Sequence, residues 1–304
     1  MEYSRGARVL LNGVRYVSTR GVNKGYVFFN NEEVIDCGEE PKPEYELAEL
    51  VATYDYSTLA VHGYSVAVEL TSYIYRGMGG ADLSTYTRSE LKKIAYAALY
   101  ELYMNGITLP IVVDQYPDIA NELAREHQLK LAILHEKGTL QHYPNTLYLE
   151  EEDGKLYFED RKLGEKNEVF CSLRDISGKC RILYVSGAPT YNASLVLFIA
   201  TGRLGGLPEA LRILSEPYRL LGLDNGYISR GSRPDILVYD LRKSVKTPPL
   251  SVPEYALLRG YPPDQVFVEG DLFFDKGEPL VLLPTSIYEI AVKHESGLHG
   301  VRAN

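Results

Sequence analysis

One short segment places two side chains at the spacing of a strand-borne chelate. Residues 55–70 have a β-type composition, and His62 and Tyr64 are separated by one residue. Alternate residues of a strand point to the same side, so an imidazole and a phenol would aim at one point. A phenol has a pKa of about 10 and stays protonated near neutral pH, so this pair is a poor chelate for a divalent metal. His62 is its one good donor.

Three further polar side chains end buried strands. Asp114 ends the apolar run 107–114, and His135 with Glu136 ends the run that begins at Leu129. Parallel sheets place their sites at the carboxyl ends of the strands. We therefore expect one candidate pocket, whose residues are His62, Tyr64, Asp114, His135 and Glu136. The alternative is a set of unrelated polar strand ends, with Asp114 capping the loop into a helix at 118–128.

The elements that carry these residues alternate between helix and strand. Thr87 and Glu90 have the spacing of a capping box, and apolar residues repeat at helical spacing from there to Asn105-Gly106. The buried strand 107–114 follows, then a helix that starts with Pro117, then the strand 129–135. This order predicts a parallel sheet with helical crossovers.

After residue 135 the pattern changes to hairpins. Segments 146–149 and 155–158 flank Asp153-Gly154, and segments 169–173 and 180–186 flank a further turn. Cys171 and Cys180 lie beside that second turn, and Cys37 is the third cysteine. A sparse, odd set favours reduced thiols. The alternative is a bridge between Cys171 and Cys180 across a hairpin, which is typical mainly of hyperthermophiles.

Both chain ends are β-rich. Residues 7–36 contain two hairpin signals, with turns at Asn12-Gly13 and Asn30-Asn31, and residues 265–277 contain another. The stretch 221–241 is predicted to leave a helix at Asn225-Gly226 and to form a ribbon of Tyr227-Ile228 and 235–240.

The stretch 221–241 resembles the segment by which amidohydrolase-superfamily enzymes leave their barrel and enter a small β-sandwich. The positions that fit are Gly222, Gly226, Ile228, Gly231, Asp235 and Asp240. Residues 106–134 and 265–277 are similar to further segments of that family. The resemblance implies a hydrolase of carbon–nitrogen bonds, other than peptide bonds, in small cyclic amides or amines.

The family's metal ligands are largely missing. Its first barrel strand carries two histidines, of which only His62 has a counterpart, since Tyr64 stands at the second position. The aspartate that ends its last strand aligns with Gly187. The resemblance implies a divalent metal such as zinc, but this donor set disfavours one, and we expect an atypical or degenerate site.

The fold class implied is α/β, a partial TIM-type (β/α) barrel plus a composite β-sandwich built from both chain ends. We expect the sandwich at 1–57 and 225–304 and the barrel at 58–224, with a hairpin insertion at about 144–180. That barrel region is shorter than the roughly 250 residues of a complete (β/α)8 barrel. Curtailment leaves open edges, so we expect the hairpins to cover one or the chain to form a homodimer.

Composition excludes some partners. The net charge is −9, and no cluster of Lys and Arg offers a nucleic-acid surface. No apolar run reaches membrane-spanning length, and the N-terminus lacks a signal-peptide core, so a cytoplasmic protein is expected. Two hypotheses remain: an amidohydrolase with an atypical site that acts on a small molecule, or a catalytically silent homologue that serves as a binding or partner subunit.

Overall fold

The computed structural model describes residues 7–75, 82–177, 179–185, 191–243, 247–248 and 251–294. The chain divides into two compact units. The first holds residues 1–65, 103–108 and 192–281, and the second holds 66–102, 109–191 and 282–304. The predicted strand over 55–70 is interrupted at Gly63, and its first half belongs to the first unit.

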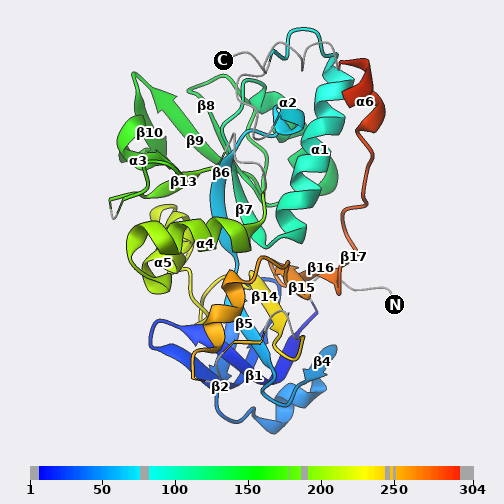
Figure 1. Cartoon of the computed structure of the whole chain (residues 1–304), viewed down its shortest axis with the longest axis vertical. Helices are drawn as coiled ribbons and strands as arrows, with labels where there is room; N and C mark the ends of the chain where they lie inside the picture. Colours follow the sequence, from blue (N-terminus) through cyan, green and yellow to red (C-terminus); the bar gives the residue numbers. More distant parts are fainter. Residues whose placement is uncertain are drawn as a thin grey trace. The chain divides into compact units, whose positions relative to one another are not determined.

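The first unit contains a nine-stranded sheet that joins both ends of the chain (Figure 1). Its order is β17-β16-β15-β14-β5-β1-β2-β3, and β4 also pairs with β1. From the amino-terminal part come β1 (Val9–Ser18), β2 (Gly21–Phe29), β3 (Val34–Gly38), β4 (Leu50–Thr53) and β5 (Thr58–His62). From the carboxyl-terminal part come β14 (Ile236–Asp240), β15 (Gln265–Val268), β16 (Asp271–Asp275) and β17 (Glu278–Pro279).

This sheet is strongly curled. In the strand order, β2 and β15 are four steps apart, which would separate them by roughly 19 Å in a flat sheet. Yet the rings of Phe29 and Phe267 meet edge to face with centroids 5.2 Å apart. Both rings belong to one buried cluster with residues of β1, β14 and β16. The curl therefore brings the two chain ends together around a shared apolar core.

One predicted turn and one predicted strand of the β-rich chain ends were wrong. Asn12-Gly13 is a bulge inside the continuous strand β1, because the carbonyl of Tyr54 lies where a side chain at position 13 would be and Gly13 has φ +68°. Tyr227-Ile228 is not a strand, so only β14 follows the exit turn. The hairpins at Asn30-Asn31 and at 265–277 are confirmed.

The second sheet has eight strands in the order β11-β10-β9-β8-β7-β6-β13-β12. Strands β9, β8 and β7 are parallel, as are β6, β13 and β12, whereas β10 and β11 are antiparallel additions. The parallel strands are β6 (Tyr64–Val68), β7 (Ile107–Val112), β8 (Ala132–Glu136), β9 (Leu147–Glu152), β12 (Phe170–Ser172) and β13 (Ile182–Tyr184). The remaining two are β10 (Lys155–Phe158) and β11 (Arg161–Glu165).

The two edges of this sheet approach each other. A flat sheet of eight strands would hold β11 and β12 about 34 Å apart. They are joined only by the single turn α3 (Lys166–Val169), across which a chain reaches about 17 Å at most. Arg181, just before β13, also donates through Nη1 to the carbonyl of Leu163 in β11 at 2.8 Å. The sheet is therefore a curled half-barrel, and the predicted first hairpin pairs with β8 through β9.

Helices complete the two units. The second unit holds α1 (Arg88–Met104) except for its last two residues, α2 (Pro117–His127), which contacts β8, and α6 (Tyr288–Lys293). Helix α1 begins with a capping box, in which Thr87 N donates to Glu90 Oε2 at 2.8 Å. In the first unit α4 (Ala193–Leu204) packs on α5 (Leu207–Leu220) and on the 3-10 helix η3 (Pro253–Leu258). Two more 3-10 turns are η1 (Pro43–Leu47) and η2 (Tyr73–Tyr75). None of the helices in the described residues could cross a membrane.

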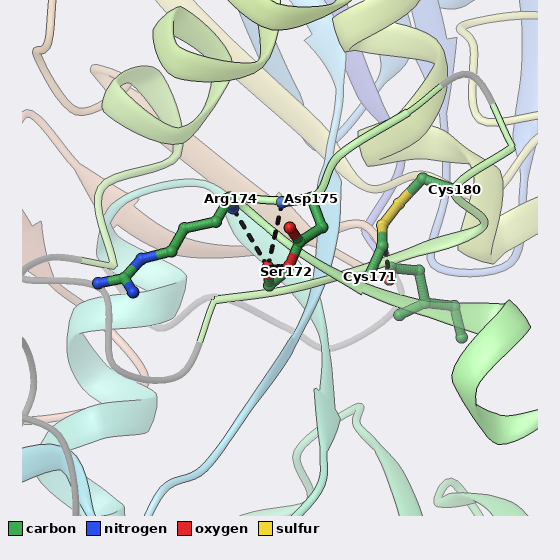
Figure 2. The surroundings of a disulfide bond; sticks show 6 residues. Cys171, Ser172, Arg174, Asp175 and Cys180 are labelled. Atoms are coloured by element: carbon green, nitrogen blue, oxygen red, sulfur yellow. Dashed lines mark hydrogen bonds between the residues drawn. A yellow bond between two sulfur atoms is a disulfide. The ribbon is translucent and has the colours of Figure 1, made fainter.

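Cys171 and Cys180 are bridged, so the expectation of reduced thiols fails for this pair (Figure 2). Their Cα atoms are 5.8 Å apart, within the usual range for a disulfide. The strands beside them, β12 and β13, are parallel, so the bridge does not span an antiparallel hairpin. Figure 2 shows the start of the connecting loop, where Ser172 Oγ accepts from the backbone N–H of Arg174 and Asp175. Cys37 is a free thiol.

Candidate functional site

His62 is the last residue of β5 and is 4% exposed. Its Nδ1 lies 3.0 Å from the carbonyl oxygen of Gly63, and its Nε2 lies 3.1 Å from Oδ2 of Asp224. Both partners are acceptors, so both ring nitrogens donate and the ring is an imidazolium. The cavity beside it has a volume of about 20 Å³, which is room for a single water.

The electrostatics of this pair agree with its geometry. Burial alone would lower the pKa of His62, but the hydrogen bond and charge of Asp224, with a smaller contribution from Asp235, raise it above the ordinary value. Burial opposes ionisation of Asp224 as well. The pKa of that carboxyl is nevertheless lowered, because it faces His62 and accepts from the backbone N–H of Gly226 and Arg233.

A second buried carboxylate extends this network. Asp235 is fully buried and accepts from the Tyr218 hydroxyl at 2.6 Å and from the N–H of Glu269 at 2.8 Å. The Tyr218 hydroxyl in turn lies 2.7 Å from Thr108 Oγ1, and its ring meets the His62 ring edge-on at 4.5 Å. Burial, together with the nearby charge of Asp235, raises the pKa of Tyr218 well above 10. These buried polar groups therefore satisfy one another by hydrogen bonds inside the first unit.

Backbone contacts hold the chain at this position. The N–H of Gly63 donates to the carbonyl of Asp235 at 2.8 Å. A Cβ at position 63 would lie 1.8 Å from Thr108 Oγ1, so only glycine allows this approach. The resemblance over 221–241 therefore reflects a structural junction, in which Asp235 accepts hydrogen bonds from three parts of the first unit.

Tyr64 lines the same small cavity as His62 but offers no second metal ligand there. It is the first residue of β6, and its side chain is buried. Burial, with a contribution from the neighbouring Tyr239, raises the pKa of the Tyr64 phenol well above 10. The phenol therefore stays protonated and offers no anionic ligand.

Asp114 lies just beyond β7, as expected, and acts as a clamp. Its carboxylate accepts from the N–H of Leu70 and of Thr71, each at 2.8 Å, and from the Thr71 hydroxyl at 2.5 Å. It also accepts from the N–H of Tyr116 at 3.0 Å. Asp114 thus fixes the chain beyond β6 to the turn before α2, which agrees with the alternative that it turns the loop into this helix, although it does not cap the helix.

Sequence reasoning missed Glu69, which directly follows β6. Its side chain accepts from Ser72 Oγ at 2.7 Å and from the Tyr184 hydroxyl at the end of β13. The signal was present, since Glu69 is an acid directly after an apolar run, as Asp114 is. The family resemblance points instead to His62, which lies in the preceding strand.

A pocket of about 630 Å³ opens at the carboxyl ends of strands β7 and β13 in the half-barrel. Tyr184 and Val113 line it at the carboxyl ends of β13 and β7, and the rest of its lining comes from Gly154, Glu165, Lys166, Asn167 and Phe170. Lys166 is held by Glu151 at 2.7 Å. Carboxyl ends of parallel strands are where such sheets bind ligands, and this volume suits a small molecule.

His135 and Glu136 end β8, but His135 has partners that the sequence did not suggest. His135 is buried, and its Nε2 lies 3.3 Å from Nε2 of His142, which in turn lies 3.9 Å from Glu150 Oε1. Glu136 is exposed and contributes its backbone oxygen, which accepts from His135 Nδ1 at 2.8 Å.

The five predicted residues therefore do not form one mouth. His62 and Tyr64 flank Gly63 at the amino end of β6, because the strand break moves the carboxyl end of that strand to Val68. Asp114 and His135 do lie at carboxyl ends, in separate hydrogen-bonded groups. Gly187, aligned with the family's catalytic aspartate, lies outside the described residues.

No protein-family model and no curated protein sequence matches the chain. Solved structures do match it. Atrazine chlorohydrolase from Arthrobacter aurescens TC1, complexed with zinc, has a TM-score of 0.67 at 11% identity, over 95% of this chain and 100% of that one. Guanine deaminase from E. coli has a TM-score of 0.64 at 11% identity, over 90% and 100%. An adenosine deaminase from Xanthomonas campestris with bound zinc has a TM-score of 0.62 at 9% identity, over 96% and 98%.

These neighbours are amidohydrolase-superfamily enzymes, and this chain has their fold. The sequence resemblance is thereby confirmed at the level of the fold. In this chain the mixed α/β fold consists of a curled half-barrel sheet and a second sheet.

The zinc that two of these neighbours hold does not fit the residues around His62. Both nitrogens of His62 already donate to oxygen acceptors, so no lone pair remains for a metal. Tyr64 is a protonated phenol. At the carboxyl end of β6, the alternate residues Val68 and Leu70 carry no side-chain donor atom at all.

Proposed function

We propose that this chain is a catalytically silent relative of the amidohydrolase-fold enzymes that binds a small molecule in the pocket at the carboxyl end of the half-barrel. The observation that carries the proposal is that the alternate residues Val68 and Leu70, at the carboxyl end of β6, have no side-chain ligand atom, while His62 lies at the other end of that strand in an ion pair with Asp224. A scaffold without ligand atoms at this strand end lacks the pair of side chains with which, by the resemblance, the family holds its metal. The degenerate site expected from the sequence is part of this proposal.

The pocket indicates the kind of ligand. Phe170 and Tyr184 offer aromatic surface, and Lys166, Glu165 and Asn167 offer hydrogen-bonding groups. The structural neighbours are named for triazine, guanine and adenosine substrates. A small nitrogen heterocycle suits a pocket of this size and mixture.

Calorimetry with adenosine, guanine and a chlorotriazine tests this function. We expect saturable 1:1 binding of at least one of them without release of ammonia or chloride. Lys166→Ala should weaken binding, whereas Lys137→Ala, which removes the exposed ion pair with Glu152 outside the pocket, should not. The absence of binding to any probe, or equal effects of the two variants, would count against the pocket.

The second candidate is a hydrolase of carbon–nitrogen bonds in small cyclic amides or amines. Glu69 favours it, because a carboxylate beside Tyr184 at the carboxyl end of the strands has the position of a general acid or base. Ammonia release from adenosine or guanine that disappears in Glu69→Gln would replace the silent protein with this enzyme.

Four further expectations from the sequence remain proposals. The curled first sheet is proposed to be the composite β-sandwich, and the shared core around Phe29 and Phe267 supports it. The homodimer stays a prediction that light scattering tests. The thermophilic source and the cytoplasmic location also stay predictions.

A further inference from the structure

We propose that His135, His142 and Glu150 form a divalent-metal site, for which zinc is the most suitable ion. The three residues come from adjacent parts of the half-barrel. His135 in β8 and Glu150 in β9 are direct partners in the parallel ladder, so their side chains leave the same face of the sheet. His142 lies in the connection between these two strands. Their ligand atoms all lie within 4.8 Å of one another.

The distances suit tetrahedral coordination. Two nitrogens bound to zinc at 2.0–2.1 Å are about 3.3 Å apart in a tetrahedron. The two Nε2 atoms of His135 and His142 are 3.3 Å apart. Glu150 Oε1 is 3.9 Å from Nε2 of His142, so a small rotation of this partly exposed carboxylate brings it within the coordination distance.

The surroundings of the two imidazoles prepare them to coordinate. Nδ1–H of His135 donates to the carbonyl of Glu136 at 2.8 Å, which leaves the lone pair on Nε2 directed at the cluster. The ring of His142 stacks on Tyr148 at 3.9 Å and 6°. Tyr148 is itself fixed, since its hydroxyl donates to Asn121 and accepts from the N–H of Tyr143. His135 thus differs from His62, both of whose nitrogens donate.

The site has an open position. A cavity of about 380 Å³ is lined by His142, Tyr148 and Glu150, together with Phe158 and Asp160. Three protein ligands with a fourth position open to a cavity are typical of zinc sites that bind water or a small ligand. Two imidazoles and one carboxylate also suit zinc better than magnesium or calcium, which prefer oxygen ligands alone.

This inference is independent of the proposed function, because the three proposed ligands include neither His62 nor any residue of the pocket at Tyr184. The test is titration of the full chain, after chelator treatment, with Zn²⁺ against a chromophoric indicator and with Co²⁺ followed by visible absorption. The variants are His142→Ala and Glu150→Gln. The matched controls are His127→Ala and Glu168→Gln, which lie outside the cluster in α2 and α3.

We expect one equivalent of Zn²⁺ in the parent chain, a tetrahedral Co²⁺ spectrum, and affinity lower by at least about tenfold in each cluster variant. Both controls should bind as the parent does. No stoichiometric binding by the parent, or equal binding by parent and His142→Ala, would overturn the site. Loss of the metal in His62→Gln, with retention in His142→Ala, would overturn both this site and the silent role of His62, whereas failure of heterocycle binding would touch only the proposed function.

Discussion

Replacing His62 by glutamine should destabilise the chain by about 3–5 kcal/mol, the usual cost of removing one partner of a buried ion pair. The variant leaves Asp224 buried with its two backbone donors but without the cation 3.1 Å away. The double variant His62→Gln/Asp224→Asn removes both charges, so it should recover part of that loss. His127→Gln, in which no buried pair is lost, should stay within about 0.5 kcal/mol of the parent.

The dependence on pH gives the sharper test. Because the pKa of His62 is raised on folding, the folded chain holds one more proton than the unfolded chain between pH about 6.5 and the folded pKa. The stabilisation is therefore complete below pH about 6.5 and decreases by about 1.4 kcal/mol per pH unit as the pH rises through that window. The lowered pKa of Asp224 has the opposite consequence: its contribution is present above pH about 4 and is lost as the pH falls through its folded pKa.

Urea denaturation at a series of pH values measures both effects. The parent should lose stability on the alkaline side of this window, and His62→Gln should lack that slope. If His62→Gln kept the slope of the parent, or if the single variants were additive in the double variant, the ion pair would not exist as described.

Two other predictions concern the disulfide and two glycine positions. Cys171→Ser/Cys180→Ser should lower the free energy of unfolding by about 2–3 kcal/mol, since the bridge closes a loop of nine residues, and reduced parent protein should match the variant. Gly63→Ala should destabilise the chain by several times the about 1 kcal/mol of a typical point mutation, because the added methyl group collides with Thr108. Gly202→Ala, on the open face of α4, should instead stabilise the chain by about 0.5–1 kcal/mol. Thermal denaturation compares each pair.

The local elements were predictable because their signals are local. The capping box at Thr87 and Glu90, the Pro117 start of α2 and the Asp153-Gly154 hairpin each depend on residues a few positions apart. Asn12-Gly13 has the same turn signal but forms a bulge, because the approach of Tyr54 from 41 residues away decides its conformation. Sequence spacing carries no information on such a contact.

The candidate site was harder to predict for the same reason. The His62–Asp224 pair and the His135–His142–Glu150 cluster both depend on which segments the sheets place side by side. The spacing of His62 and Tyr64 predicted one site, but the break at Gly63 puts them in different strands of different sheets. Glu150 belongs to no sequence motif. It joins the cluster only because the register of β8 and β9 places it opposite His135.

The two histidines show why the acceptors around a ring decide its chemistry. His62 and His135 are equally buried, and each donates through Nδ1 to a neighbouring backbone carbonyl. At His62 the other nitrogen faces a carboxylate that two backbone N–H groups keep ionised, so a proton is retained there. At His135 the other nitrogen faces Nε2 of His142, and the carboxylate of Glu150 lies 3.9 Å beyond that imidazole, so a cation can bind between the three groups. Family resemblance located the first histidine, but the arrangement of acceptors assigns the metal to the second.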